Sequence, residues 1–542
     1  MDKKEYIVTV HNKEDLCDIY DEMECHHCAC TAKRPLSRNT HFLLSEEEVE
    51  RLRNDPRIWG VELVESFHIK AQAYTNLQSY QISGNFWKDD TQAPSTISPT
   101  DRQWGHLHCA GNSGQRGSGL YGSIAGGGTY EIVNETIDIY NDGKNADIII
   151  VDDPISYDSE EWISPTTSTS RFVQYQWFNE LNSIVAGVDD DGQTLPTGTI
   201  TYETNANTPE FHGIHVAGTA AGQHYGWARE ANIYNLAVTA SWPSGQILPA
   251  LLIFDYIRAF HANKPINPAT GRRNPTITNH SYAYVYLMPN DNLTFADVNS
   301  VIYQGITYNS GNPGPSGWNE AGLETDFGLR FGLAAMPQWS PSIIADVQDA
   351  IEEGIVVIGA AGNDNLMIAE TNDVNWNNRV DISGVGTIYY NRGGAPNTPE
   401  SGSIIVGAIS ASHNFDPASF SNYGPAIDVF APGQNIASSF GNTGLVDGKY
   451  AAGNYFYPIN GTSMASPQVA GAAALLATNK IRLTNADVRN YLNNTSVENG
   501  MSNLQANTPN KFLHVKKDIN KTIGIRQPVG QVYPRTSIVY SN

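Results

Sequence analysis

The segment Asn460-Gly461-Thr462-Ser463-Met464-Ala465-Ser466-Pro467 is a small, polar run that leads directly into an alanine-rich apolar stretch ending at Ala477. The apolar stretch is typical of a buried helix, and the polar run places Ser463 at its start. Unpaired N–H groups and the positive end of the helix dipole meet there and would stabilise a developing oxyanion. Pro467 is tolerable in a first helical turn, where a missing N–H costs little. A serine that only caps a core helix has the same pattern, so a catalytic Ser463 requires a base and an acid elsewhere.

A candidate acid follows the apolar run Ile148-Ile149-Ile150-Val151, which ends in Asp152 and Asp153. Four successive apolar residues predict a parallel strand covered on both faces, and active sites lie just past the carboxyl ends of such strands. An aspartate that caps a turn is the alternative interpretation. Asp189 follows another short apolar run and is a rival, but the run before Asp152 is longer, which favours Asp152.

A candidate base, His212, precedes Gly213 and a small-residue segment that ends at Gly222. Small residues allow a helix to pack closely against a neighbouring element. A lone histidine is more often structural, but this one accompanies an acid and a serine. Further along the chain, a predicted buried strand at 354–361 ends in Gly362 and Asn363, which by themselves predict only a turn.

These segments resemble the aspartate, histidine and serine motifs of the subtilases, and they occur in the subtilisin order. The resemblance spans about residues 103–492 and implies an α/β, subtilisin-like three-layer fold, with a mostly parallel sheet flanked by helices. It implies a serine endopeptidase in which Ser463 is the nucleophile, His212 the base and Asp152 its orienting acid. In the same comparison Asn363 takes the place of the oxyanion donor.

The resemblance also implies where a peptide would bind. The segment 276–284 occupies the place of the family strand that pairs with extended peptides, and β-augmentation holds a peptide without reading its side chains. Ser281, Tyr282 and Ala283 would line the first specificity pocket. Because Ala283 replaces a family glycine, we expect a narrower pocket mouth; a core strand with exposed aromatic residues is the alternative. Ala361 and Gly362 are further expected substrate contacts.

Besides Ala283, three residues depart from the family pattern. Asp153 stands where a small hydroxyl residue is usual, Pro154 replaces a glycine, and Ile214 replaces the commoner threonine. The irregular aspartate motif favours one alternative, a catalytically inactive subtilase fold that serves as a structural or binding module. A non-peptidase hydrolase with the same triad is a second alternative.

The chain divides into four predicted parts. Residues 1–68 alternate predicted strands and helices, with a capping box at Ser45-Glu46-Glu47-Glu48, and predict a small α+β domain. That domain resembles a subtilase propeptide, which implies an intramolecular inhibitor. Residues 69–102 predict a linker with a maturation site, 103–500 the peptidase domain with an inserted loop at 365–402, and 501–542 a tail without a clear pattern.

The chain carries 33 basic and 56 acidic side chains, for a formal net charge of -23. This balance argues against nucleic acid and anionic membranes as partners. The resemblance to the subtilases implies a protein or peptide substrate. No apolar run predicts a signal peptide or a membrane span, so we expect a cytoplasmic or virion-associated protein, for which a phage-encoded origin is one interpretation. The expected chemistry requires no cofactor or metal; structural calcium on carboxylates is an alternative that the sequence does not locate.

Five cysteines are present, and four of them lie within the first thirty residues. An odd number in a cytoplasmic protein argues against a disulfide framework. Cys17 with the segment Cys25-His26-His27-Cys28-Ala29-Cys30 could supply zinc ligands, but a second pair at finger spacing is missing. Free thiols are therefore the expected state.

Overall fold

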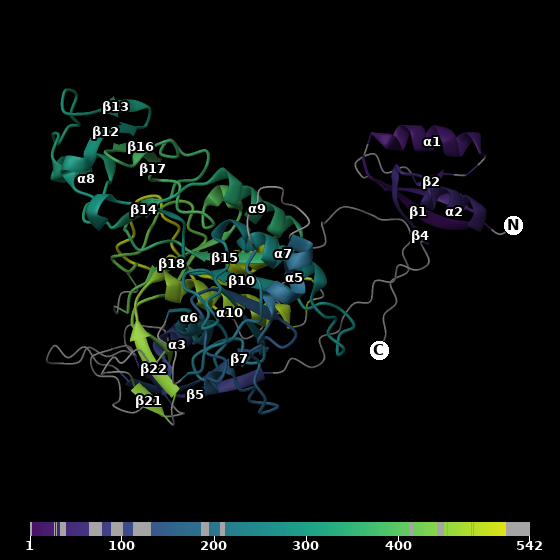
Figure 1. The fold of residues 1–542 in the computed structure, drawn as a ribbon, viewed down its shortest axis with the longest axis horizontal. Helices are drawn as coiled ribbons and strands as arrows, with labels where there is room; N and C mark the ends of the chain where they lie inside the picture. The colour runs from purple at the N-terminus through teal and green to yellow at the C-terminus, as the bar shows by residue number, and fades with distance from the viewer. Residues whose placement is uncertain are drawn as a thin grey trace. The chain divides into compact units, whose positions relative to one another are not determined.

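A computed structural model describes residues 3–12, 14–26, 28, 30–32, 39–63, 79–87, 101–111, 132–185, 195–205, 212–411, 416–441, 449–451, 454–478, 480 and 482–515. The chain forms two compact units (Figure 1), of which the first comprises Met1–Asn76 with Ile525–Asn542 and the second Leu77–Gly524. Each unit has a hydrophobic core of its own.

The first unit is a small α+β domain, as the sequence predicts, and consists of a four-stranded sheet with two helices. Its elements are β1 (Lys4–Val10), α1 (Asp15–Cys25), β2 (Cys30–Ala32), β3 (Asn39–Leu44), α2 (Glu46–Arg53) and β4 (Ile58–Leu63). The strand order is β2-β3-β1-β4, and β2 is one strand more than predicted. The capping box is observed, because Ser45 Oγ accepts from the Glu48 amide and Glu48 Oε2 accepts from the Ser45 amide at 2.6 Å.

Among the residues described in this unit, the cysteines do not form the zinc site that their spacing could have provided. Cys28 is buried and its thiol donates to Glu48 Oε1 at 3.1 Å, whereas Cys17, Cys25 and Cys30 are exposed. Within the described part of the chain, no cysteine belongs to a group of three or more potential metal ligands.

The second unit is built on an eight-stranded sheet that is parallel except for one terminal antiparallel pair. In spatial order its strands are β23 (Val497–Glu498), β24 (Lys511–Phe512), β19 (Val429–Pro432), β18 (Ile404–Ile409), β15 (Val356–Ala360), β10 (Thr276–His280), β8 (Asp147–Asp152) and β9 (Asn232–Ala237). All residues of β8, β10, β15 and β18 are buried. The apolar runs of β8, β15 and β18 are covered on both faces, which confirms the predicted sheet, and the mostly polar β10 is buried as well.

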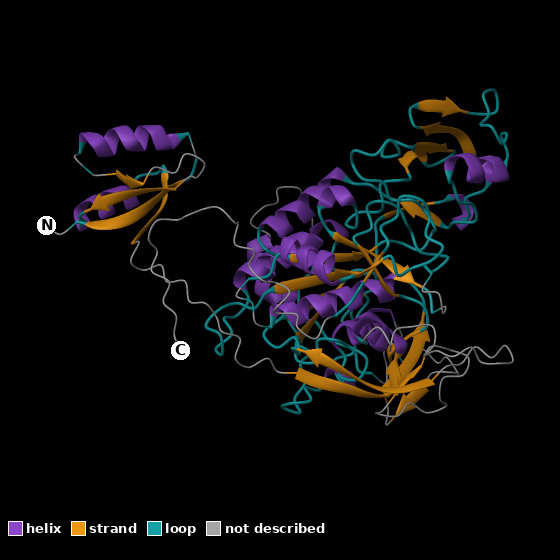
Figure 2. Cartoon of the chain, turned by 180° about the vertical axis from the view of Figure 1, so that it is seen from behind, coloured by secondary structure: helices purple, strands orange, loops and turns teal. Residues whose placement is uncertain are grey.

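Helices cover both faces of this sheet (Figures 1 and 2). α10 (Thr462–Ala477) and α6 (His212–Ala221) pack against each other, and α10 crosses β10, β15 and β18. On the other side lie α5 (Trp177–Val185), α7 (Ile253–Asn263) and α9 (Pro341–Glu352). Every residue of α10 is buried, so this helix lies in the interior of the unit. No helix of the described residues is both long enough and apolar enough to cross a bilayer.

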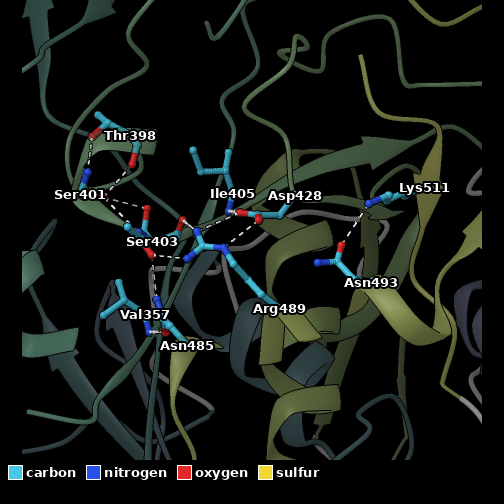
Figure 3. A network of polar contacts seen from close by, with 11 residues as sticks. Val357, Thr398, Ser401, Ser403, Ile405, Asp428, Asn485, Arg489, Asn493 and Lys511 are labelled. Atoms are coloured by element: carbon cyan, nitrogen blue, oxygen red, sulfur yellow. Dashed lines mark hydrogen bonds and ion pairs between the residues drawn. The ribbon is translucent and has the colours of Figure 1, made fainter. Parts of the chain in front are cut away.

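A polar network fixes the amino ends of two central strands (Figure 3). It comes from α11 (Asn485–Thr495), where Asn485 Oδ1 accepts from the Val357 amide at 2.8 Å. Arg489 Nε donates to Asp428 Oδ1 at 2.9 Å, and Asp428 Oδ2 accepts from the Ile405 amide at 2.9 Å. These contacts secure β15 and β18 at one end and leave their carboxyl ends for the site.

A satellite region, defined here as residues 285–337 and 366–390, has a second core within the same unit. Its elements are β11 (Val285–Leu287) paired with β14 (Ala335–Pro337), the sheet β13-β12-β16-β17 (Ile306–Tyr308, Val298–Tyr303, Arg379–Ile382 and Gly386–Tyr389), and α8 (Glu320–Phe327). The predicted inserted loop at 365–402 is therefore wrong in part, because β16 and β17 lie within it. Short strands separated by Asn, Asp and Gly hide this core from sequence patterns.

Two predicted boundaries also need correction. The predicted linker at 69–102 contains β5 (Ser79–Trp87), which pairs along its length with β7 (Ile132–Tyr140). Ile82 is buried between the exposed Gln81 and Ser83, and Gly84 and Phe86 are buried after it, a period-two pattern hidden among Ser, Gln and Gly. At the other end, β24 joins the main sheet and Val515 is buried, so the predicted tail from 501 belongs in part to the second unit.

The remaining elements complete this unit. They are β6 (Asp101–Gln103), α3 (Trp104–Ala110), and the antiparallel sheet of β20 (Ile436–Phe440), β22 (Asn454–Ile459) and β21 (Lys449–Ala451). β20 packs against α6, the helix that begins at His212.

Candidate active site

Ser463 is the second residue of α10, as the sequence predicts, and is 7% exposed. The helix starts after Gly461, whose φ of +154° is a conformation that other residues rarely adopt. Ser463 thus lies in the first turn, where backbone N–H groups have no partner within the helix. Its hydroxyl donates to the Ser281 carbonyl oxygen at 3.2 Å.

Pro467 has a more specific effect than the sequence suggested. It lies beyond the first turn, so its missing N–H leaves the carbonyl of Ser463, four residues earlier, without its helical partner. The Ser281 hydroxyl supplies the missing donor at 3.0 Å, and it also lies 3.0 Å from Ser466 Oγ. The helix of the candidate nucleophile is therefore bonded to the segment that follows β10.

His212 is the first residue of α6, and its Nδ1 lies 2.7 Å from Asp152 Oδ1. Asp152 is the last residue of β8, is 1% exposed, and also accepts from the Asp153 amide at 2.8 Å. The carboxylate fixes the proton on Nδ1, which leaves Nε2 to accept a proton. The predicted pairing of Asp152 with His212 is observed.

The three candidate residues converge at one edge of the main sheet. β8 and β10 are neighbours, and Val151 is paired with His280, so Asp152 and Ser281 follow at adjacent strand ends. Ser281 contacts Ser463, while Asp152 contacts His212, and α6 packs on α10. This is the carboxyl edge, where open parallel sheets hold their ligands.

Charge controls the ionisation of His212. Burial lowers the pKa of His212, but the charge and hydrogen bond of Asp152, with the charge of Asp153 added, outweigh it and raise that pKa to about 9. Each carboxylate favours the imidazolium form. The free imidazole that a general base requires is therefore populated mainly at alkaline pH.

Asn363 follows β15 and faces the start of α10. Its Oδ1 accepts from the Thr462 amide and from the Thr462 hydroxyl, both at 2.9 Å. With Oδ1 held in this way, the Nδ2 group of the exposed side chain is left as the donor. Asn422 supports the same turn, because its Nδ2 donates to the Ala361 carbonyl at 2.8 Å and its Oδ1 accepts from the Leu366 amide.

The predicted substrate residues lie on two adjoining segments. Ser281, Tyr282 and Ala283 extend β10, while Ala361 and Gly362 extend β15, its neighbour in the sheet. Ser281 is buried, Tyr282 is half-buried and Ala283 is exposed. Gly362 has a φ of +105°, and a Cβ there would meet Asn422 Nδ2 at 2.4 Å, so the turn requires glycine.

Sequence patterns did not single out Asn397, which braces the first of these segments. Its Nδ2 donates to the carbonyls of His280 at 3.2 Å and Tyr282 at 2.9 Å, and the side chain is 2% exposed. It reaches them from a segment in which Ser401 Oγ lies 2.8 Å from the Pro396 carbonyl oxygen. A single asparagine in a loop rich in Asn and Pro carries no pattern that could have revealed this role.

Comparison with known proteins agrees with this geometry. The model of the Subtilase family matches residues 143–513. The chain belongs to the subtilase family. Among known subtilases, Subtilisin Savinase from Lederbergia lenta is 33% identical over 168 residues, which are 31% of this chain and 48% of that protein. Subtilisin amylosacchariticus from Bacillus subtilis subsp. amylosacchariticus is 36% identical over 166 residues, 31% of this chain and 35% of that protein.

The chain therefore spans about half the length, or less, of these two relatives. A crystal structure of a cold adapted subtilisin-like serine proteinase covers 69% of this chain and 90% of its own, with 22% sequence identity and a TM-score of 0.40.

The unusual aspartate motif of this subtilase keeps the contact to His212. The Asp153 amide donates to Asp152, and its carboxylate accepts from the Thr239 hydroxyl. A Cβ on Gly213 would lie 2.6 Å from the Asp153 carbonyl oxygen, so α6 can approach the strand end only because glycine follows His212. The rival Asp189 lies outside the described residues.

Asp152, Asp153 and His212 bring ligand atoms within 4.8 Å of one another, and they are the only such group of three among the residues that the structure describes. In this structure His212 Nδ1 is engaged by Asp152 Oδ1, so a cation that used Nδ1 would have to replace that hydrogen bond.

Proposed function

We propose that this subtilase is a serine endopeptidase that uses Asp152, His212 and Ser463. The observation that carries the proposal is the 2.7 Å contact between Asp152 and His212 at the sheet edge where Ser463 begins α10. A buried carboxylate, an imidazole and a hydroxyl in these positions match the roles of a nucleophilic triad. Protein or peptide substrates follow from this chemistry, which requires no cofactor.

In the proposed reaction, His212 Nε2 takes the Ser463 proton as Oγ forms a bond to the carbonyl carbon of the scissile peptide. The Ser463 hydroxyl must first leave the Ser281 carbonyl, and the N–H of a bound peptide can take its place there. The oxyanion accepts hydrogen bonds from Asn363 Nδ2 and the Ser463 amide. Removal of one such donor from subtilisin itself costs about 2.7–4 kcal/mol, and we expect a loss of the same order here.

His212 then protonates the departing amine, and the acyl group remains on Ser463. Water hydrolyses this acyl-enzyme with His212 again as the base. Asp152 remains ionised throughout and stabilises the imidazolium that forms in each half of the reaction.

Maturation is part of the proposal. The first unit would act as an intramolecular inhibitor that is released by cleavage between residues 67 and 102. Within this range, residues 67–78 and 88–100 lie outside the described part of the chain. Intact-mass analysis of the purified wild type should reveal loss of an N-terminal piece, and the Ser463→Ala variant should retain it.

The test of the triad compares wild type with Ser463→Ala and with Ser342→Ala, an exposed serine in α9. Casein cleavage and labelling by a fluorophosphonate should be lost only in Ser463→Ala. An unlabelled wild type that is folded would support the inactive binding module, for which the irregular Asp153-Pro154 sequence is the favouring observation. Labelling without cleavage of casein or peptides would support a different hydrolase.

A further inference from the structure

We propose that residues 281–287 form one continuous peptide-binding edge, and that β11 extends the substrate site into the satellite region by binding apolar residues far upstream of the scissile bond. The inference rests on the proposed endopeptidase function and deepens it. It identifies a class of substrate, namely extended chains with apolar side chains at the fifth and seventh positions on the acyl side.

The backbone of this segment alternates between a bonded side and a free side. On the bonded side, the carbonyls of His280 and Tyr282 accept from Asn397, and the Tyr284 amide donates to the Ala395 carbonyl at 2.8 Å. The Tyr284 carbonyl accepts from Gln338, and the Met288 amide donates to Ala334, both at 2.9 Å. Even-numbered residues from 280 to 288 thus direct their polar groups inward.

The odd-numbered residues face the other way, as the alternation of an extended strand requires. The Ser281 carbonyl accepts only from the Ser463 hydroxyl. In the β11–β14 register, Val285 and Leu287 lie between residues 284 and 288, which bond to the β14 side, so their backbone groups point away from β14. β14 is the sole strand partner of β11 among the described residues. The free edge therefore begins beside the nucleophile and continues without interruption along β11.

Side chains follow the same alternation. Tyr282 and Tyr284 pack on the main core and Tyr286 packs on the satellite core. Ala283 is exposed, and the residues Val285 and Leu287 are 44% and 70% exposed. An exposed apolar strand with an unpaired edge is a template for pairing with another extended chain.

The position of Ser463 sets the register of that chain. The acyl-side residue next to the scissile bond lies at Ser281, and the edge runs away from it, so the peptide runs antiparallel to the edge. In an antiparallel pair, each step of two residues along one strand matches a step of two residues along the other. The third, fifth and seventh acyl-side residues therefore lie opposite Ala283, Val285 and Leu287. Directly opposed side chains share one face, so apolar residues at the fifth and seventh positions would cover Val285 and Leu287.

The experiment uses the full-length protein and three peptides that share the four residues before the scissile bond. The first peptide has only these four residues on the acyl side. The second has eight acyl-side residues, with leucine at the fifth and seventh positions, and the third has the same length with serine at both positions. We expect kcat/KM to be about tenfold higher for the leucine peptide than for the short one, and intermediate for the serine peptide. N-methylation of the fifth residue should remove most of the gain, because it removes a main-chain donor.

The variant Val285→Ser/Leu287→Ser should lower kcat/KM of the leucine peptide about fivefold and leave the short peptide unchanged. Ile306→Ser is the matched control, because Ile306 is 54% exposed on β13 of the same region and lies outside the edge. Fluorophosphonate labelling of Ser463 should be equal in all of these proteins.

Equal kcat/KM for the three peptides in a labelled, active enzyme would overturn this inference and leave the proposed function intact. A concentration-dependent dimer that the double variant abolishes, without any dependence on peptide length, would assign the edge to a second copy and overturn it as well. Absence of all labelling and turnover would instead refute the proposed function.

Discussion

The carboxyl edge of the main sheet and the satellite region belong to one compact unit, but they are held in different ways. β8, β10 and β15 are buried on both faces and α10 is buried along its whole length, so the side chains at this edge have little freedom. The satellite region depends on its own small core and on short antiparallel strands with one exposed face. The candidate triad thus lies on fully buried elements, and peptide recognition, as we infer it, reaches onto the region with the smaller core.

The largest expected effect tests the rigid edge. Asp152→Asn should lower kcat on a short peptide by a factor on the order of 10⁴, because an amide leaves His212 in the wrong tautomer while the fold is retained. Steady-state kinetics with a thermal unfolding curve would measure both. Asp153→Asn is the matched control and should lower kcat far less; similar losses for the two variants would break the assignment of the orienting acid.

The next prediction asks whether the two cores are separable. Leu323 is fully buried in α8, so Leu323→Ala should destabilise the satellite region by about 3 kcal/mol. Native-state hydrogen exchange should accelerate in β12 and β16 but not in β8 or β15, and turnover of short peptides should persist. Leu251→Ala is the control: this leucine is 57% exposed, so the substitution should change neither the stability of the satellite region nor the hydrogen exchange of its strands. Equal acceleration in β8 would show that both cores unfold as one.

Asn397 connects the two regions, because its segment follows the satellite region and braces the strand end beside Ser281. Asn397→Ala should leave two buried carbonyls without a donor, at a cost of about 1–3 kcal/mol, and lower kcat/KM for peptides about tenfold. Asn397→Asp, which also lacks the donor, should behave similarly. The rate of fluorophosphonate labelling should stay unchanged; a parallel loss of labelling would place Asn397 in support of the nucleophile instead.

The smallest effect of a substitution should be a shift in the pH profile, which His212 sets at the rigid edge. Since the pKa of His212 is raised to about 9, most of the base is protonated at neutral pH, and kcat/KM should rise as pH increases through 9. The same ion pair stabilises the fold fully below the ordinary pKa of 6.5, and that contribution should disappear as pH rises from 6.5 to 9. Asp153→Asn should move the kinetic inflection to lower pH. An inflection that does not move would remove Asp153 from the electrostatics of the site.

The same difference between the main sheet and the satellite region explains which elements could be predicted from the sequence. Parallel strands such as 147–152 are buried on both faces and leave continuous apolar runs, and the glycine and small-residue patterns beside His212 and Ser463 made their placement predictable. β5 and the satellite strands alternate single apolar residues with Ser, Asn and Gly, so local patterns resemble loops. Asn397 and Ser281 act through contacts between distant segments, which no spacing rule along one chain can express.

Pro467 has a consequence that extends beyond its own helix. Any other residue there would offer the Ser463 carbonyl a main-chain donor, and the helix could then compete with Ser281 for that oxygen. Proline has no main-chain N–H to compete for this oxygen. The Ser463 carbonyl therefore accepts its hydrogen bond from Ser281, which lies 182 residues away in the chain. We therefore expect a bound peptide that displaces the strand beside Ser281 to displace the Ser463 backbone as well, through this hydrogen bond.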